Sequence, residues 1–433
     1  MLIEFKFKNY RSFRDESVLS MEATGLSTFK NSLIELPNKA KMLPALAIYG
    51  KNGGGKSNVI RAFWLAVQFI KNAQRTQHES AEIPVVPFIL DDDSRDLPTE
   101  FSFNYVFNDI QYIYGFSATK KTIISEYLYH TPKGQKALVF SRNNQSFKYT
   151  TEVSKRKLIE KMVAPNQLFF SIASAANDTD CINAMRWFRE CVFFSRDYSD
   201  IPAQLLEFSE DKKMLESITD YAKAADLGIV DMQFKFNSEI IETGSPLPER
   251  LPEGLKEALS KYIKSLSETS NGAAVKLHLG EVSATANHQG INKKNENSLY
   301  PLDISDESDG TRKLMSLAPA VESALRTGGI LLVDEIEKEL HPKLVNFLIS
   351  KFQSKKTNTN GAQIIFTTHS TELMNLELLR KDQICFADKR NSDGVSELYS
   401  ISDFATRTTE NIRKGYLVGK YGAIPDVDLE EVD

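Results

Sequence analysis

One eight-residue run constrains this chain more than any other feature. Residues 50–57 read Gly-Lys-Asn-Gly-Gly-Gly-Lys-Ser and fit the pattern G-x-x-x-x-G-K-[ST] of a phosphate-binding loop, or P-loop. In such a loop backbone N–H groups face the phosphates, the lysine reaches the β and γ oxygens, and the following hydroxyl ligates Mg²⁺. The pattern therefore predicts a nucleotide site with Ser57 as a magnesium ligand. The predicted nucleotide contacts in this region are Gly50, Asn52, Gly53, Gly54, Gly55, Lys56, Ser57 and Asn58.

The residues on both sides of this run support the interpretation. The apolar stretch 43–49 is typical of a buried strand, and residues 58–70 carry apolar side chains at helical spacing. The phosphates would then lie at a helix N-terminus, where the helix dipole and unpaired donors favour anions. A strand, loop and helix in this order predict an α/β fold.

Two carboxylates follow an apolar run in the last third of the chain. Residues 330–333 are Ile-Leu-Leu-Val, and Asp334 and Glu335 come directly after them. We expect Asp334 to hold Mg²⁺, directly or through water, and Glu335 to polarise the attacking water. The alternative is a core strand whose end meets solvent. The presence of the P-loop favours the catalytic interpretation.

A histidine follows a second apolar strand, which we predict over residues 363–368. A lone histidine is usually a surface or core residue. His369, however, comes at the carboxyl end of a strand, where open α/β sheets bind their ligands. This position favours a catalytic role for His369 as a sensor of the γ-phosphate.

Residues 307–312, Glu-Ser-Asp-Gly-Thr-Arg, precede a helix predicted over residues 313–326. Ser308 and Gly310 would form a small turn whose backbone donors face an anion, and Gly310 precedes Asp334 by 24 positions (334 minus 310). The alternative is an ordinary helix with Ser308 as its N-cap. The order of all four motifs favours the nucleotide-binding interpretation.

In this order the motifs resemble the ABC-type ATPase head of the SMC/RecF/OLD group, over about residues 1–70 and 300–390. Residues 2–13 also resemble the first strand of that group, whose Asn-aromatic-Arg-Ser turn lies near the nucleotide; this adds Arg11 to the expected nucleotide contacts. Residues 337–342 and 413–425 look like the stand-alone ATPases of bacterial abortive-infection and Rlo-type anti-phage systems. The implied fold is an α/β ABC-type ATPase head, a P-loop mixed sheet with an antiparallel β subdomain, plus a helical or mixed insertion.

The resemblance further implies that two heads dimerise head to tail. Ser308 and Gly310 would then contact the ATP bound to the partner. Two features depart from the group. The usual Leu-Ser-Gly-Gly-Gln signature is missing, and Asp309 close to a triphosphate would be repulsive unless it points away. The glutamine expected after the first helix is also missing from residues 83–90, so no residue is assigned to that role.

Composition is that of a globular protein, with 41% hydrophobic and 26% charged residues in 433. The net charge of −5 argues against a domain that coats nucleic acid. No stretch approaches the roughly 18 to 20 apolar residues that span a bilayer, and the N-terminus lacks a secretory core, so we expect a cytoplasmic protein without a membrane partner. Cys181, Cys191 and Cys385 lack zinc-site spacing and are expected to be buried thiols.

Patterning along the chain predicts three segments. Residues 1–150 would form an N-terminal lobe with the P-loop and an antiparallel meander over 100–150. Residues 151–297 would form a mostly helical, lid-like insertion, and residues 298–433 a C-terminal lobe with a docking tail. Within the insertion we expect helices over 183–194, 211–227 and 250–268 and a mobile polar loop over 285–297. Heptads are not sustained, so long coiled coils are not expected.

Together these features predict a nucleotide-gated switch that uses ATP and Mg²⁺. The first hypothesis, implied by the resemblance, is the ATPase subunit of an anti-phage defence system that controls a separate nuclease or toxin. The effector is expected to be a separate protein, because only 64 residues follow His369 (433 minus 369), too few for a Toprim nuclease. Asp426 and Asp428 also lack the upstream acidic residue that such a nuclease needs. The alternative is a RecF-like DNA repair ATPase, which would bind nucleic acid. A transporter ATPase is weakest, because Ser57 and Ser308 are 251 positions apart (308 minus 57). The tail over 413–425 is either a docking segment or a closing loop.

Overall fold

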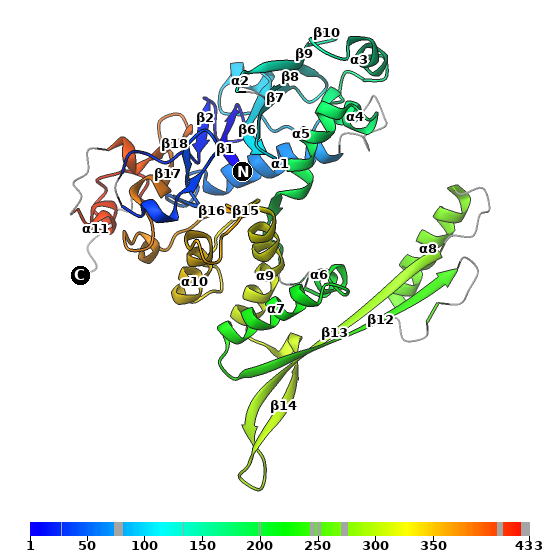
Figure 1. Cartoon of the computed structure of the whole chain (residues 1–433), viewed down its shortest axis with the longest axis vertical. Coiled ribbons are helices and arrows are strands. Elements are labelled where there is room, and N and C mark those ends of the chain that lie inside the picture. Colours follow the sequence, from blue (N-terminus) through cyan, green and yellow to red (C-terminus); the bar gives the residue numbers. More distant parts are fainter. Residues whose placement is uncertain are drawn as a thin grey trace. The chain divides into compact units, whose positions relative to one another are not determined.

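The chain folds into two compact units. We call Met1–Ser195 with Ala320–Asp433 the head and Arg196–Pro319 the insertion. Figure 1 labels their elements. The computed structural model describes residues 1–26, 28–72, 81–132, 134–197, 199, 201–242, 247–248, 253–269, 276–404 and 410–425.

The head contains a six-stranded, mostly parallel sheet. Its strands, in spatial order, are β11 (Val192–Phe194), β15 (Ile330–Val333), β16 (Gln363–Thr367), β5 (Ala45–Tyr49), β17 (Ile384–Lys389) and β18 (Ser396–Ser400). Only β18 runs antiparallel to its neighbour. Every residue of β5, β15 and β16 is buried, because both faces of the sheet are covered; the sequence therefore shows them as continuous apolar runs. The strand β16 lies between the P-loop strand and the strand that precedes Asp334.

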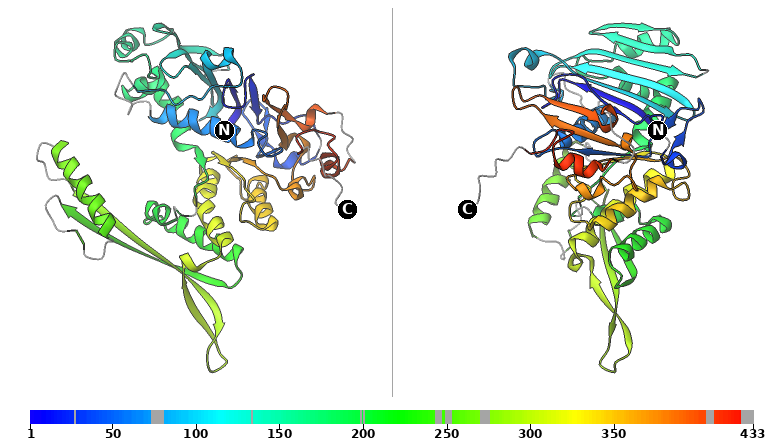
Figure 2. Two further views of the ribbon diagram at one scale, coloured as in Figure 1. Left: turned by 180° about the vertical axis from the view of Figure 1, so that it is seen from behind. Right: turned by 90° about the vertical axis from the view of Figure 1, so that its left-hand side faces the viewer.

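A second sheet in the head is antiparallel and confirms the predicted meander; Figure 2 shows its strands side by side. Its order is β10 (Ser146–Tyr149), β9 (Ala137–Asn143), β8 (Ile123–Thr131), β7 (Ile110–Ala118), β6 (Thr99–Phe107), β1 (Leu2–Lys8) and β2 (Ser17–Ser20). Alternate residues along β6 are buried, as expected for a sheet with one covered face. The mixed sheet and this antiparallel sheet together give the α/β ABC-type head that the sequence predicted.

Aromatic side chains join the helices of the head to the antiparallel sheet. Phe63 of α1 (Lys56–Asn72) has its ring centroid 4.8 Å from that of Phe5 and 5.2 Å from that of Phe103. On the same sheet, Trp187 of α5 (Thr179–Glu190) stacks on Tyr105 at 4.4 Å. These aromatic side chains are all buried and therefore belong to the core of the head. The other helices of the head are α2 (Asp92–Asp96), α3 (Val153–Glu160), α4 (Phe169–Ala175), α10 (Pro342–Gln353) and α11 (Ile412–Leu417).

The insertion combines helices with a three-stranded antiparallel sheet. Its elements are α6 (Ile201–Glu207), α7 (Lys212–Ala225), β12 (Ile229–Glu242), α8 (Glu253–Thr269), β13 (Lys276–Ile291) and β14 (Asn297–Asp303). The helices α7 and α8 confirm the predictions for 211–227 and 250–268, although residues 250–252 lie outside the described ranges. The helix α9 (Asp309–Thr327) begins in the insertion, and the division between the units falls at Pro319 within it.

Two predictions for secondary structure were wrong. Residues 285–291 are not a loop but the end of β13, which pairs with β14; the small buried side chains of Ala284 and Ala286 alternate there with polar ones, and so the strand pattern is weak. The helix predicted over 183–194 ends at Glu190, because the carbonyl of Cys191 accepts a hydrogen bond from the backbone of Ile330 at 2.7 Å and starts β11.

The observed division also differs from the three expected segments. Residues 151–195 belong to the head, since α5 contributes its aromatic side chains to the core of the meander. The insertion runs to Pro319, and long strands make up much of it.

All three cysteines are free and buried, as predicted. None of the helices in the described ranges combines the length and apolarity needed to cross a bilayer. Asp426 and Asp428 lie outside the described residues.

Candidate nucleotide-binding site

The P-loop connects β5 to α1 and depends on glycine at positions where the backbone is crowded. Gly50, Gly53 and Gly55 have φ values of 153°, 74° and 113°, in the region that disfavours side chains. A Cβ atom on Gly54 would lie 2.6 Å from the carbonyl oxygen of Ala387 in β17, and one on Gly50 would lie closer still. The neighbouring strand therefore fixes the path of the loop.

Lys56 is buried at the first position of α1 and lies folded over the P-loop. Its Nζ donates to the carbonyl oxygens of Gly50 at 2.9 Å and Lys51 at 3.1 Å. Burial lowers the pKa of Lys56, whereas the negative charges of Glu335 and Asp334 oppose that shift. An ammonium held by two neutral carbonyls can exchange them for the oxygens of a phosphate, which compensate its charge more fully.

The two predicted magnesium ligands are in direct contact, although 277 positions separate them. The Ser57 hydroxyl donates to Asp334 Oδ1 at 3.0 Å. Thr367 Oγ1 donates to the same oxygen at 2.6 Å and so holds the carboxylate toward the P-loop. A hydroxyl and a carboxylate are the hard oxygen donors that Mg²⁺ prefers, so these residues fit the ion.

Glu335 follows at a sharp bend of the backbone. Its φ is 51°, which is unusual for a residue with a side chain. The bend is held because the Glu335 backbone N–H donates to Thr367 Oγ1 at 2.7 Å. Thr367 thus positions both acidic residues. The sequence analysis did not predict this role, although a hydroxyl at the end of a buried, mostly apolar strand could have indicated it.

His369 is exposed just beyond the carboxyl end of β16, close to the predicted position. Its backbone N–H donates to Glu337 Oε1 at 2.5 Å. The negative charge of Glu337 also opposes the lowering of the Lys56 pKa by burial, as the charges of Glu335 and Asp334 do. Glu337 therefore belongs to the site, and the sequence analysis missed it because the preceding Asp-Glu pair already filled the expected acidic roles.

The N-terminal turn reaches α1 through Ser12, not through Arg11. Asn58 Nδ2 donates to Ser12 Oγ at 2.9 Å. The Arg11 guanidinium instead lies 5.8 Å from the centroid of the Tyr10 ring, and its Nε donates to the Tyr10 hydroxyl at 3.2 Å. The side chain of Asn58 thus holds the turn against the start of α1.

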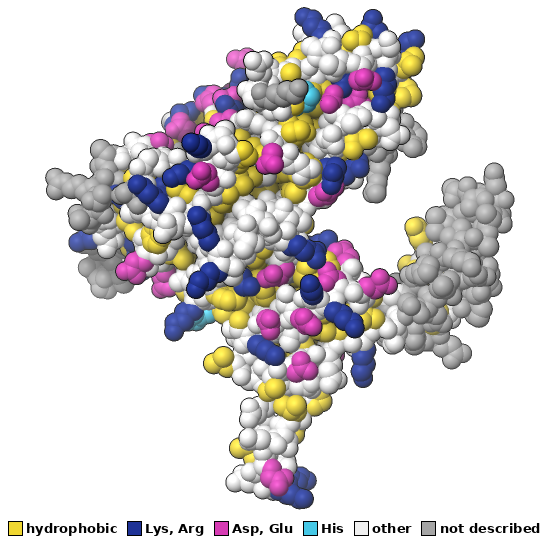
Figure 3. All heavy atoms as spheres, viewed as in Figure 1, with side chains coloured by type: hydrophobic (Ala, Val, Ile, Leu, Met, Phe, Trp, Pro, Cys, Tyr) yellow, Lys and Arg dark blue, Asp and Glu magenta, His cyan; other side chains and the backbone are white. Residues whose placement is uncertain are grey.

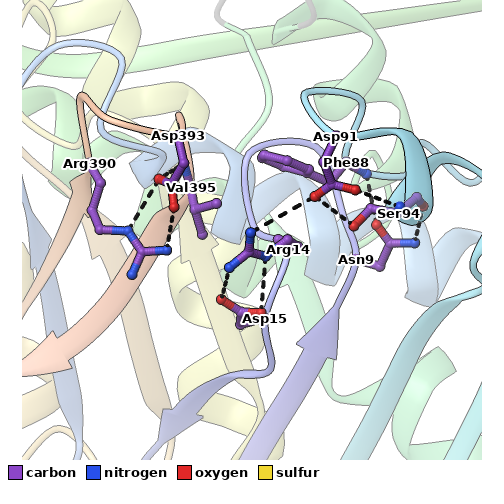
Figure 4. A network of polar contacts seen from close by, with 9 residues as sticks. All are labelled: Asn9, Arg14, Asp15, Phe88, Asp91, Ser94, Arg390, Asp393 and Val395. Atoms are coloured by element: carbon purple, nitrogen blue, oxygen red, sulfur yellow. Dashed lines mark hydrogen bonds and ion pairs between the residues drawn. The ribbon is translucent and has the colours of Figure 1, made fainter.

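Asn9 joins this turn to the loop that follows α1 in the sequence, as Figure 4 shows. Asn9 Oδ1 accepts from the backbone of Phe88 at 2.9 Å, and its Nδ2 donates to the carbonyl of Ser94 at 2.8 Å. The backbone N–H of Arg11 also donates to the Val86 carbonyl at 2.8 Å. Backbone contacts therefore hold the loop over residues 83–90, where the usual glutamine is missing.

The C-terminal tail packs against β17 beside the P-loop. Tyr416 stacks on Phe386 with a centroid separation of 5.5 Å. Asp388 accepts from the backbone of Ala423 at 3.1 Å and forms an ion pair with Lys51 of the P-loop at 3.2 Å. The described part of the tail is thus a closing segment of the head.

Ser308 and Gly310 lie at the start of α9 in the insertion. The Ser308 hydroxyl accepts from the backbone of Thr311 at 3.1 Å, so it caps the helix, and Ser308 is exposed. Asp309 pairs with Arg312 at 2.5 Å. The ion pair compensates the negative charge of Asp309.

The geometry defines a class of protein. A glycine-rich loop at the start of a buried helix, a hydroxyl–carboxylate pair, and a strand between β5 and β15 form the head of an ABC-type P-loop ATPase.

The chain belongs to the AAA_21 family, described as "AAA domain, putative AbiEii toxin, Type IV TA system", which matches residues 46–375. The match confirms the ATPase resemblance drawn from the motifs. Over 63 residues the chain is 40% identical to "Retron Vc95 probable ATPase" of Vibrio cholerae serotype O1 biovar El Tor. This stretch spans 14% of the chain and 12% of that relative.

Two solved structures overlap most of the chain at low similarity. One is the SmcHead bound to the C-winged helix domain of ScpA, with a TM-score of 0.40 and 14% identity over 92% of this chain and 97% of that one. The other is the recombination mediator protein RecF-ATP in the RecFOR pathway, with a TM-score of 0.33 and the same identity and coverage. With TM-scores below 0.5, they add no argument to the family match.

Proposed function

We propose that the protein is an ATP-binding and ATP-hydrolysing switch. The observation that carries this proposal is the contact of Ser57 with Asp334 beside the buried Lys56. In phosphoryl transfer, the protein contributes mainly positioning and compensation of charge. Lys56 and the N-terminus of α1 would neutralise the phosphates, and Ser57 and Asp334 would hold Mg²⁺, which neutralises charge on the β and γ oxygens.

Glu335 is the proposed residue that orients the attacking water. Its backbone is fixed through Thr367, which also holds the carboxylate of Asp334, so one side chain positions both residues. His369 is proposed to contact the γ-phosphate, and Glu337 to position His369 through its backbone N–H. Preorganised charges of this kind are the main source of catalysis in phosphoryl transfer.

The switch would operate as a head-to-tail dimer in which each ATP lies between two copies. Ser308 and Gly310 of one copy would contact the nucleotide held by Lys56 of the other. The exposure of Ser308 and the pairing of Asp309 with Arg312 support this role. ATP binding would then close the dimer, and hydrolysis would release it.

The proposed biological role is the ATPase subunit of an anti-phage abortive-infection system that controls a separate effector. The family description, with its AbiEii toxin and toxin–antitoxin terms, supports a defence role. The short match to a retron ATPase supports it further.

The test is purification of Glu335→Gln with ATP and Mg²⁺ from cells that express the neighbouring genes. We expect trapped nucleotide, a closed oligomer and a copurified nuclease or toxin. Glu339→Gln is the matched control, because Glu339 is exposed in the same turn and also has a positive φ. A persistent monomer with empty sites would contradict the switch. ATPase activity that DNA stimulates, without a protein partner, would instead indicate a RecF-like repair role.

A further inference from the structure

We propose that the insertion binds one divalent transition-metal ion, of the Mn²⁺ or Zn²⁺ class, through Asp226, His288 and Glu307. These residues come from three places: the C-cap of α7, the strand β13 and the segment before α9. One ligand atom from each lies within 4.8 Å of the other two. Binding at this site does not depend on the ATPase function proposed above.

The cluster has an excess of negative charge. His288 Nε2 lies 2.7 Å from Glu307 Oε1, and the Glu307 side chain is only 3% exposed. Among the ion pairs of the described residues, neither Asp226 nor Glu307 has a lysine or arginine partner. Two carboxylates and one imidazole remain net negative even when the imidazole is protonated. A buried carboxylate needs compensation, and a divalent ion supplies it.

A glycine leaves room on one side of the cluster. A Cβ atom on Gly228 would lie 3.1 Å from both Asp226 Oδ1 and His288 Nδ1. The Gly228 backbone also fixes the geometry, since its N–H donates to Asp226 Oδ1 at 2.8 Å and its carbonyl accepts from Gln289 of β13 at 3.0 Å. The carboxylate of Asp226 is thereby held next to the imidazole.

The donor set selects the class of metal. Imidazole nitrogen suits Zn²⁺ and similar ions, and carboxylate oxygen suits Mn²⁺, whereas Ca²⁺ and Mg²⁺ take oxygen ligands alone. Bonds of about 2.0–2.2 Å place neighbouring ligand atoms about 3 Å apart. Glu307 Oε1 and His288 Nε2, 2.7 Å apart, are already close to that separation, and the ligand atoms of all three residues lie within 4.8 Å of one another, so a bound ion would draw them slightly together. Water would complete the coordination.

The position of the site gives the ion a structural consequence. Glu307 directly precedes Ser308, the cap of α9. A bound ion would tie this start of the helix to β13 and to the end of α7. If Ser308 and Gly310 contact ATP as proposed, the metal fixes the segment that carries them; this consequence alone rests on the proposed function.

The experiment uses the full-length Asp334→Asn protein without nucleotide, so that the P-loop offers no complete metal site. Electron paramagnetic resonance counts bound Mn²⁺ during a titration, and its pulsed form detects coupling to imidazole nitrogen. Elemental analysis after gel filtration counts Zn²⁺. We expect one ion per chain with an imidazole nitrogen signal. His288→Gln and Asp226→Asn, each added to this protein, should weaken binding at least about tenfold, the lower end of the loss seen even for changes to residues that only hydrogen-bond the metal ligands.

His130→Gln is the matched control. His130 lies 4.0 Å from a carboxylate, Asp180, with a side chain 20% exposed against 19% for His288, but it lies outside the cluster. Binding should be unchanged in this variant. Failure of the folded protein to bind Mn²⁺ or Zn²⁺ at micromolar concentrations, absence of the nitrogen signal, or equal affinity in His288→Gln would overturn the proposal. No readout involves ATP hydrolysis, so the outcome is independent of the nucleotide-trapping test.

Discussion

The head and the insertion assemble their polar clusters in different ways. In the head, Ser57 meets Asp334 across 277 positions because the carboxyl ends of parallel strands converge at one edge. In the insertion, β12, β13 and β14 pair as an antiparallel run of successive strands. Short sequence motifs therefore predict the nucleotide site of the head, whereas no motif predicts the cluster around His288. The comparison teaches that a polar cluster can form where the sequence shows no motif.

The largest effect is expected from a buried ion pair of the head, which tests whether that unit compensates its own buried charges. Arg156 is fully buried and donates to Asp178 at 2.8 Å and to Asp180 at 2.7 Å. Removing one partner of such a pair costs about 3–5 kcal/mol. Arg156→Ala should lower the free energy of unfolding by that amount in a urea titration at pH 7. Arg186→Ala, which breaks an exposed pair with Glu190, is the control and should change little.

The same variant carries a pH dependence. Burial alone would raise the pKa of Asp178, but hydrogen bonds from Arg156 and the backbone of Cys181 outweigh it and hold the pKa below its ordinary value. The stabilisation is therefore full above the unfolded pKa of about 3.9 and is lost as the pH falls through the folded value. The cost of Arg156→Ala should shrink below about pH 4. An equal cost at pH 3 and pH 7 would show that the pair acts through packing instead.

Removal of the P-loop lysine tests whether the motif of the head has the expected chemistry. Lys56→Ala should reduce kcat for ATP hydrolysis by about 10²- to 10³-fold, the usual loss for one group that stabilises transition-state charge. Stability should not fall, because burial already lowers the pKa of this ammonium. Lys71→Ala is the control at the other end of α1, where burial also lowers the pKa. An unchanged kcat for ATP hydrolysis in Lys56→Ala would contradict the proposed role of Lys56 in the P-loop.

Thr367→Val tests the role of the β16 hydroxyl that contacts both Asp334 and Glu335. It leaves the Glu335 N–H without its partner and frees Asp334, so it should cost about 1–3 kcal/mol and lower kcat more than ATP affinity. Thr368→Val removes a neighbouring hydroxyl that accepts only from Ser370 at 3.0 Å among the hydrogen bonds of the described residues. This control should lose stability without losing turnover. Equal kinetics in both variants would separate Thr367 from the site.

The smallest effect is expected in the insertion. Leu299 on β14 is 54% exposed, and Figure 3 shows apolar side chains along this hairpin. Leu299→Ala should change stability by no more than about 0.5 kcal/mol. Leu332→Ala in β15, a leucine 1% exposed, should cost about 2–5 kcal/mol. A large loss for Leu299→Ala in calorimetry would mean that another surface covers this face.

The sequence predicted the elements whose signals are local. The P-loop, its strand and its helix are contiguous, and Asp334, Glu335 and His369 each follow a fully buried strand. The roles of Thr367 and Glu337 depend on which strands become neighbours, and β16 lies beside β5 only after folding. A periodic pattern cannot show this.

The same limit explains the errors at β11 and β13. Val192 starts a strand only because the backbone on either side of it pairs with β15, far along the chain. The end of β13 alternates small and polar side chains, which look like a loop until β14 pairs with them. The cluster of Asp226, His288 and Glu307 likewise arises from three segments that the sequence keeps apart.

The central position of β5 has a consequence for synthesis of the protein. Its partners are β16 and β17, which begin at Gln363 and Ile384. A chain still emerging from the ribosome has therefore released its P-loop long before β5 acquires either neighbour. During that interval the apolar strand has two open edges, the condition that invites aggregation and chaperone capture. The strand that leads into the P-loop therefore gains both of its neighbours only after β17 has been synthesised.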